Sequence, residues 1–189
     1  MKTFSLAALL LSGLFLSTKS QAQGTMKEEH TVMVGGAAMF PSKDIVSNAV
    51  NSKDHTTLVA AVKAAGLVET LQGEGPFTVF APTNEAFEKL PAGTVDNLLK
   101  EENKATLTTV LTYHVVAGKL DSKELMNWIK KGKGSYELKT VQGGKLWIMQ
   151  KGNGLVLKDE KGGMANITIK DVYQSNGVIH VIDSVLMPQ

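Results

Sequence analysis

The spacing of hydrophobic residues changes character along the chain. In the first half, apolar residues recur every three or four positions, as in helices packed on one face. From Ser135 onward, short runs of alternating apolar and polar residues are separated by glycine-rich turns, as in strands. Helices gathered before strands favour an α+β fold.

The most clearly bounded strand is predicted at residues 77–81, directly after Gly75-Pro76. Alternation assigns its side chains to two faces, one with Phe77, Val79 and Ala81 and the other with Thr78 and Phe80. Pro82 has no N–H group, so the hydrogen bonding of this strand is expected to end there.

A helix is predicted immediately after this strand. Thr83 or Asn84 can cap it, because short polar side chains accept hydrogen bonds from the first N–H groups of a helix. Glu85 then lies where a carboxylate favours the helix dipole, and Phe87 turns inward. One short segment thus supplies a buried strand, a corner and a helix start.

Further helices are predicted on both sides of this unit. Ser42 or Asp44 caps a short first helix, and Asp54 caps a second that ends at Gly66. His55, in the first turn of that second helix, is expected to be solvated.

Later in the chain, residues 103–112 form a clearer helix, and Ser122 caps another. His114 follows on the inward face of the first of these. The last strand, residues 177–183, is apolar on both faces and contains His180, so it is predicted to be central and covered on both sides.

The N-terminus has the pattern of a secretory signal peptide. Lys2 precedes an apolar run from Phe4 to Leu16, and small residues lie before a cleavage point near Ala22. The run is shorter than the roughly 20 residues of a membrane span. The sequence therefore predicts a secreted or periplasmic protein without membrane insertion, divided into a signal peptide (1–22), an exposed lead-in (23–41) and a folded domain (42–189).

Composition excludes several kinds of site. The chain has no cysteine, so disulfides, thiolate nucleophiles and cysteine-ligated metals are impossible. It has no arginine, and loss of Lys2 and Lys19 with residues 1–22 would leave 18 lysines against 18 acidic residues. A neutral chain without guanidinium groups has no electrostatic footprint for nucleic acid. With its signal peptide, this composition is typical of a bacterial protein.

Glu28, Glu29 and His30 could be interpreted as metal ligands. Three neighbours on an exposed lead-in are poorly placed to converge on one ion. We therefore expect no metal site and no cofactor.

Three segments resemble the sequence blocks of fasciclin-like domains. They are Phe-Thr-Val-Phe-Ala-Pro-Thr-Asn-Glu-Ala-Phe at 77–87, Tyr113-His114, and Asn-Gly-Val-Ile-His-Val-Ile-Asp at 176–183. Their order within residues 42–189 makes the resemblance specific. It implies a wedge of two β-sheets with helices packed along one edge, and a secreted or surface module used in adhesion and matrix contact, usually without chemistry.

The resemblance also marks individual positions. The structural motif residues are Phe77, Thr78, Phe80, Ala81, Pro82, Thr83, Asn84, Phe87, Gly177, His180 and Asp183. Animal members bind integrins through an Asp-Ile pair before the last block and through the tyrosine–histidine region. The matching positions here are Asp171-Val172, with valine in place of isoleucine, and Tyr113-His114. The alternative for the first pair is a structural turn residue beside a strand residue.

Two functions remain open at this point. A non-catalytic adhesion or interaction module would contact a cell-surface or matrix protein or polysaccharide, and would bury His114 and His180 as hydrogen-bonded core residues. An extracellular polymer-cleaving enzyme, an ester-linkage hydrolase or lyase, would use Tyr113 or His114 as a general base in an open cleft. The sequence contains neither a Gly-x-Ser-x-Gly elbow nor a His-Glu-x-x-His helix. We expect the non-catalytic module, with exposure of the His114 ring as the discriminating feature; the sequence sets no partner identity and no oligomeric state.

Overall fold

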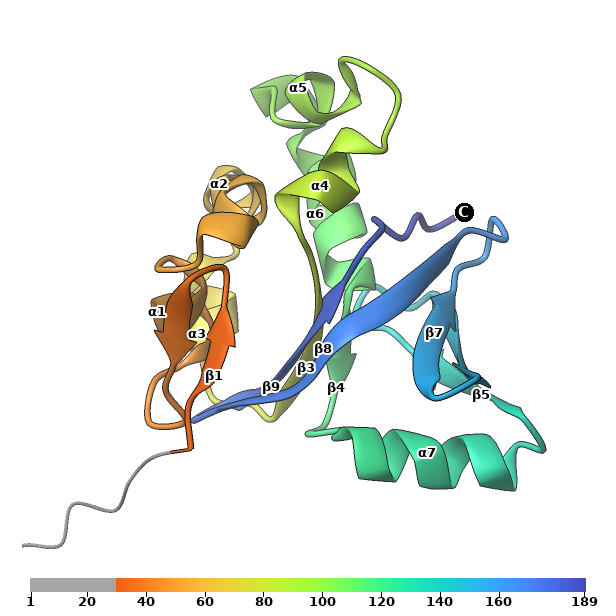
Figure 1. The fold of residues 1–189 in the computed structure, drawn as a ribbon. Coiled ribbons are helices and arrows are strands. Elements are labelled where there is room, and N and C mark those ends of the chain that lie inside the picture. The colour runs from red at the N-terminus through yellow and green to blue at the C-terminus, as the bar shows by residue number, and fades with distance from the viewer. Residues whose placement is uncertain (1–29) are drawn as a thin grey trace, which may run out of the picture.

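The computed structural model describes residues 30–189, an α+β arrangement of a two-stranded sheet, a seven-stranded sheet and helices (Figure 1). The strands are β1 (Val32–Val34), β2 (Ala37–Met39), β3 (Phe77–Pro82), β4 (Val115–Ala117), β5 (Ser135–Lys139), β6 (Lys145–Lys151), β7 (Gly154–Lys158), β8 (Met164–Gln174) and β9 (Gly177–Ile182). The helices are α1 (Ile45–Ala49), α2 (Thr56–Ala65), α3 (Val68–Gln72), α4 (Asn84–Glu88), α5 (Thr94–Leu98), α6 (Lys104–Tyr113) and α7 (Ser122–Lys131), with 3₁₀ turns η1 (Lys53–His55) and η2 (Glu101–Asn103). The expected signal peptide lies outside the described residues.

The large sheet has the strand order β4-β3-β9-β8-β7-β6-β5. Strands β3 and β9 run parallel, with Phe77 opposite Gly177 and Pro82 opposite Ile182, and the other neighbours are antiparallel. The first residues of the long strand β8 pair with β7 and its later residues pair with β9. Strand β8 thus joins two halves of the sheet, which Figure 1 shows diverging from it. The predicted α+β fold is confirmed.

Two hydrophobic cores lie on opposite faces of β3 and β9. Val79 and Ala81 of β3 join α1, α2 and α3 in the first, which we call the helix-side core. Phe80 points the other way, into a sheet-side core with residues of β5, β6, β7 and α7. Figure 1 shows the helical layer beside one half of the sheet and α7 below the other. The two faces predicted for residues 77–81 are confirmed, because Val79 and Ala81 enter one core and Phe80 enters the other.

Two predictions for helix ends near β3 are confirmed, the cap of α4 and the end of α2. Thr83 caps α4, its hydroxyl accepting a hydrogen bond from the Ala86 N–H at 3.3 Å. Gly66 ends α2 with a φ of 74°, a left-handed conformation that suits glycine. The strand extends through Pro82, one residue further than predicted, because that residue still lies opposite Ile182.

Two predicted helix caps differ from the structure. Asp54 lies within the turn η1 rather than capping α2, and His55 occupies the capping position. Before α7, the carboxylate of Asp121 accepts the hydrogen bond from the Glu124 N–H, and Ser122 is the first helical residue. Of the two candidates before α1, the cap is Asp44, which accepts from the Ser47 N–H at 2.9 Å.

Residues 30–41 are not an exposed lead-in, and this part of the prediction is wrong. Strands β1 and β2 form a hairpin around Gly35 and Gly36, both at positive φ. Val34 and Met39 are 2% and 3% exposed and belong to the helix-side core. The small apolar residues of this stretch therefore alternate into the core instead of forming a tail.

No helix within residues 30–189 is long and apolar enough to cross a lipid bilayer.

Candidate functional site

Tyr113 lies at the end of α6 with its ring in the sheet-side core, fully buried. Its hydroxyl donates to the Lys145 carbonyl at 2.6 Å and accepts from the Glu160 N–H at 3.2 Å. Burial raises the pKa of Tyr113 to about 12, so the phenol stays protonated at neutral pH. These contacts tie α6 to the first residue of β6 and to the β7–β8 connection, which is a structural role.

His114 follows at the helix end and is 3% exposed. Its Nδ1 lies 2.8 Å from the Val110 carbonyl, and its Nε2 accepts from the Leu186 N–H at 3.0 Å. One neutral tautomer, with the proton on Nδ1, satisfies both bonds. Burial lowers the pKa of His114 to about 4. Because both nitrogens are engaged by the backbone, the ring is not arranged as a general base in an open cleft.

Removing the Tyr113 hydroxyl tests its structural role. We expect Tyr113→Phe to lower the free energy of unfolding by about 1–2 kcal/mol, because the Lys145 carbonyl and Glu160 N–H lose their partner. Tyr136→Phe, at a tyrosine that is 36% exposed, is the matched control and should change stability by less. Urea denaturation of both variants gives the comparison, and equal effects would refute the structural assignment.

Asp171 interrupts β8 at an irregularity. The β8–β9 register shifts between Ile169 and Val172, and Asp171 has a φ of 61°, a conformation rare for residues other than glycine. Its carboxylate holds the start of α7, accepting from the Ser122 N–H at 2.6 Å and from the Ser122 hydroxyl. These bonds compensate for the unfavourable backbone conformation and fix the bulge against the α7 N-terminus.

His180, in β9, contacts the same bulge through the Asp171 backbone. The ring is fully buried, stacks on Phe80 with centroids 5.7 Å apart, and bonds through Nε2 to the Leu120 carbonyl at 2.8 Å. Its Nδ1 accepts from the Asp171 N–H at 3.3 Å. Burial lowers the pKa of His180, which keeps the ring neutral. His180 thus connects β9 to Leu120, just before α7, and to Asp171 in β8.

The proposed binding residues separate into one surface residue and three buried ones. Asp171 is partly exposed, whereas Val172 is 1% exposed and belongs to the helix-side core. Tyr113 and His114 are buried as described. Alternation and helix packing turn the side chains of Val172, Tyr113 and His114 inward, and burial of His114 is what the non-catalytic interpretation expects. A binding role for these positions stays a prediction.

Sequence reasoning missed an exposed aromatic residue that lies beside Asp171. Tyr173 is 39% exposed, the Lys119 Nζ lies 5.3 Å from its ring centroid, and its hydroxyl donates to Asp121 at 3.3 Å. We call Lys119, Asp121, Ser122, Asp171 and Tyr173 the Asp171 surface. The alternation that buries Val172 also predicts that Tyr173 faces outward, but only the fold brings residues 119–122 beside it.

Motif residues of the first and last blocks make structural contacts. The Thr78 hydroxyl donates to the Gly118 carbonyl at 2.6 Å and accepts from the Leu120 N–H at 2.9 Å. A Cβ atom on Gly177 would lie 2.1 Å from the Phe77 carbonyl oxygen, so only glycine permits the close pairing of β3 and β9 there.

The polar motif residues Asn84 and Asp183, which lie just after β3 and β9, also join separate segments of the fold. Asn84 donates to the Lys53 carbonyl at 2.8 Å, joining α4 to the turn before α2. Asp183 accepts from the backbone N–H and the side-chain amide of Asn166 at 2.8 and 2.7 Å, joining β9 to β8. Among residues 30–189, no cluster of three or more potential metal ligands is found.

Comparison with known proteins gives concordant matches. The fasciclin domain model matches residues 53–188. Protein sll1483 of Synechocystis sp. is 45% identical over 179 residues, which cover 94% of this chain and 92% of that protein. Immunogenic protein MPB70 of Mycobacterium bovis is 39% identical over 153 residues, covering 78% of this chain and 70% of the relative.

A solved structure shows the same fold. It is a FAS1 domain pair from the insect cell adhesion molecule fasciclin I, with a TM-score of 0.54 and 21% sequence identity. The match covers 69% of this chain and 43% of that chain.

Proposed function

The chain belongs to the fasciclin domain family, and from this membership we propose that it is a secreted, non-catalytic interaction module that contacts a cell-surface or matrix protein or polysaccharide. The solved relative that shares its fold comes from a cell adhesion molecule. The burial of His114 and Tyr113 supports the non-catalytic assignment, because neither side chain has an atom available for proton transfer to a substrate in a cleft.

The observation that carries the proposal is the Asp171 surface. It combines an exposed aromatic ring with charges of both signs. Asp171 is fixed there because its carboxylate accepts from the Ser122 N–H and its own N–H donates to His180 Nδ1. A rigid surface loses little conformational entropy on binding, and tyrosine is enriched in interfaces. Asp171 serves here as the residue that holds the surface in shape, and Tyr173 as its contact residue.

The net charge of the chain bears on whether long-range electrostatic attraction or local contacts provide the affinity. A mature chain with 18 lysines and 18 acidic residues has little long-range steering, so affinity depends on local contacts. Multivalency adds to this affinity where two copies of the domain are linked, because linkage makes the second binding event intramolecular.

Replacement of Tyr173 tests this surface. We expect Tyr173→Ala to reduce retention of the chain by the cell envelope of its own host about tenfold, the effect of losing one aromatic contact residue worth roughly 1.4 kcal/mol. The control is Tyr136→Ala, at a similarly exposed tyrosine on β5. Both variants are compared with the unchanged chain by fractionation of envelope and medium, after circular dichroism shows that they are folded.

Treatment of the envelope then distinguishes the two classes of partner. Loss of retention after protease treatment indicates a protein, and loss after glycosidase treatment indicates a polysaccharide. An unchanged chain that stays in the medium would refute surface attachment, and equal retention of the two tyrosine variants would refute the Asp171 surface as the contact.

A further inference from the structure

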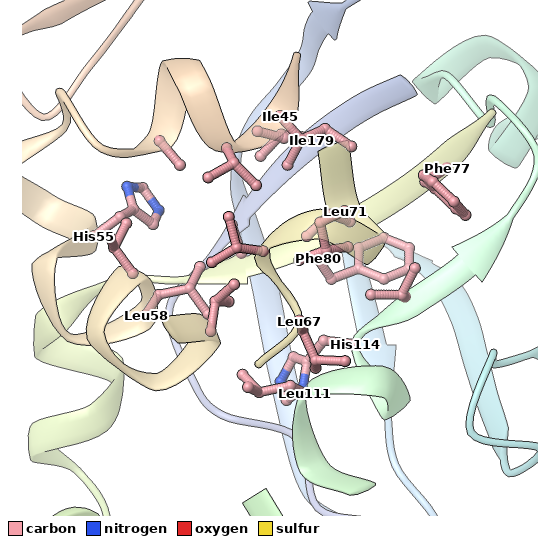
Figure 2. Close-up of a pocket in the computed structure, with 18 of the residues that line it drawn as sticks. Ile45, His55, Leu58, Leu67, Leu71, Phe77, Phe80, Leu111, His114 and Ile179 are labelled. Carbon is pink, nitrogen blue, oxygen red and sulfur yellow. The ribbon is translucent and has the colours of Figure 1, made fainter. Parts of the chain in front are cut away.

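An open hollow lies on the outer face of β5, β6 and β7, the face turned away from the sheet-side core, in the half of the domain away from the helical layer (Figure 1). Its volume is about 440 Å³, and small-molecule sites occupy about 300–1,000 Å³. The apolar cavity between the helical layer and the sheet holds only about 80 Å³ and is lined by residues of the helix-side core (Figure 2). Of these two spaces, the outer hollow is the one with room for a ligand.

The alternation that fills the sheet-side core also builds this outer face. Leu146 and Ile148 of β6 point into that core, so Trp147 between them points outward. Trp147 lies opposite Lys158 of β7 in the strand register, and side chains paired in this way are about 4.5–5.5 Å apart at their Cβ atoms. Trp147 and Lys158 both line the hollow, together with residues 159–162 of the β7–β8 turn.

The centre of the outer face is apolar. Val156 is 4% exposed although it belongs to neither core, and its partner across the β6–β7 pair is Met149. Met149 and Trp147 are half-buried and line the hollow, and Met164, on the other side of Lys158, is 50% exposed. A flat apolar surface with an indole ring offers a large contact area to a ring that is apolar on its faces and polar at its edge.

Lysine side chains surround this apolar centre. The outward positions of the strands and the adjoining turn carry five of them, Lys139, Lys145, Lys151, Lys158 and Lys161. The acidic residues of the same region are three, Glu137, Asp159 and Glu160. The outer face therefore has a small positive excess.

The acidic groups are already engaged within the chain. Glu137 forms an ion pair with Lys145 at 3.3 Å. The Asp159 carboxylate accepts hydrogen bonds from three backbone N–H groups, and the Glu160 carboxylate accepts from two. The other four lysines form no ion pair with any residue of the stretch 30–189. The charge left available to a partner is therefore positive.

A small positive excess matches a polymer with few negative charges. A nucleic acid carries a phosphate at every nucleotide, and proteins bind it by neutralising many phosphates with lysine and arginine. Three carboxylates beside the hollow would repel such a densely charged chain. A polysaccharide with a carboxylate on only some of its sugar units has fewer charges, and its sugar rings have apolar faces that can pack on an indole ring.

We propose that the outer face of β5–β7 binds an acidic polysaccharide in which only some sugar units carry a carboxylate. One sugar ring packs on Trp147, and carboxylates bind the ammonium groups of Lys158 and Lys161. A lysine ammonium has three N–H donors and no acceptor, so it suits a carboxylate. This site shares no residue with the Asp171 surface and goes beyond the function proposed for that surface, and neither depends on the other.

The test uses polygalacturonate at three degrees of methyl esterification, because esterification removes carboxylate charges and keeps the sugar rings. Affinity of the full chain is measured by isothermal titration calorimetry. We expect the half-esterified polymer to bind about fivefold more tightly than the fully esterified one, as two lysine–carboxylate contacts predict. This preference should be lost in about 1 M salt, where charges are screened over about 3 Å. The polymer with a carboxylate on every sugar should bind no more tightly than the half-esterified one.

Fluorescence reports whether the polymer reaches the hollow. The chain has two tryptophans, so Trp128→Phe leaves Trp147 as the only indole. Its emission should change on addition of the half-esterified polymer, with the midpoint found by calorimetry. Unchanged emission during binding would overturn the contact with Trp147. Tighter binding of heparin or of oligothymidylate than of half-esterified polygalacturonate would overturn the sparsely charged polysaccharide as the partner class.

Variants then assign the contacts. Trp147→Ala should weaken binding about tenfold, as for a central aromatic contact, whereas Phe40→Ala, at an exposed ring elsewhere, should not. The double variant Lys158→Gln and Lys161→Gln changes only exposed side chains and should abolish the preference for the half-esterified polymer, with Lys63→Gln as its control. A preference that persists in the double variant would overturn the lysine assignment. Weakening by Tyr173→Ala but not by Trp147→Ala would place the polymer on the Asp171 surface, which overturns this site and leaves the proposed function intact.

Discussion

Replacing Phe80 with alanine is expected to lower the free energy of unfolding by about 4 kcal/mol, within the range for truncating a buried phenylalanine. The Phe80 side chain is fully buried in the sheet-side core and stacks on His180 at 5.7 Å. Alanine would leave a cavity where β3 meets the other half of the sheet, and would remove one face of the packing that orients the His180 ring. Urea denaturation followed by circular dichroism measures the change.

Phe40→Ala is the matched control for this substitution. Phe40 is 36% exposed, and its ring contacts the Lys43 ammonium group at 4.9 Å. Loss of this contact is expected to cost about 1 kcal/mol or less. If the two alanine variants unfold at the same urea concentration, Phe80 does not join the two halves of the sheet as described.

The strand around Phe80 was predictable because its signals are local. A two-residue period, a preceding Gly-Pro and a following Pro define β3 and its two faces without reference to the rest of the chain. The same applies to β9, where both faces are apolar and both are buried. Local patterns of this kind decide the element and its faces, and the α+β class follows from their order along the chain.

His55 was mispredicted because its environment is built from distant segments. The residue stands in a helical first turn, where exposure is the usual outcome. The turn that carries His55 is joined to the β1–β2 hairpin, where the Lys53 N–H donates to the Gly35 carbonyl at 3.1 Å, and the hairpin itself was interpreted as an exposed lead-in. One missed element thus preceded a second error in the turn that is bonded to it.

The Asp171 region shows what a family resemblance can supply. The resemblance pointed to a segment of β8 that is partly exposed at Asp171. It also placed Val172, Tyr113 and His114, whose side chains are buried, among the expected binding residues. A residue in a strand and its neighbour face opposite ways, so a position taken from a motif must be checked against the register. Here the register shift at Asp171 puts Val172 inside and Tyr173 outside, and the contact from Ser122 lies 49 residues away in the sequence.

Acidification is expected to destabilise the protein through His114. Its pKa falls from the ordinary 6.5 to about 4 because of burial, so the unfolded state binds more protons than the folded state between these values. The stabilising contribution of the neutral ring is complete above pH 6.5 and is lost as the pH falls toward 4. The loss amounts to about 3 kcal/mol for this residue. Burial lowers the pKa values of His180 and His55 as well, and both act in the same direction.

His114→Gln isolates this contribution, because glutamine does not titrate. Urea denaturation between about pH 7.5 and about pH 4 should show a variant that is less stable than the unchanged chain at the upper limit, but whose stability falls by about 3 kcal/mol less on acidification. His30→Gln, at an exposed histidine, should follow the unchanged chain throughout. A His114→Gln variant with the pH dependence of the unchanged chain would show that the ring is protonated without cost in the folded state. That result would contradict its burial between the Val110 carbonyl and the Leu186 N–H, and it would return His114 to the set of groups able to exchange protons with a substrate.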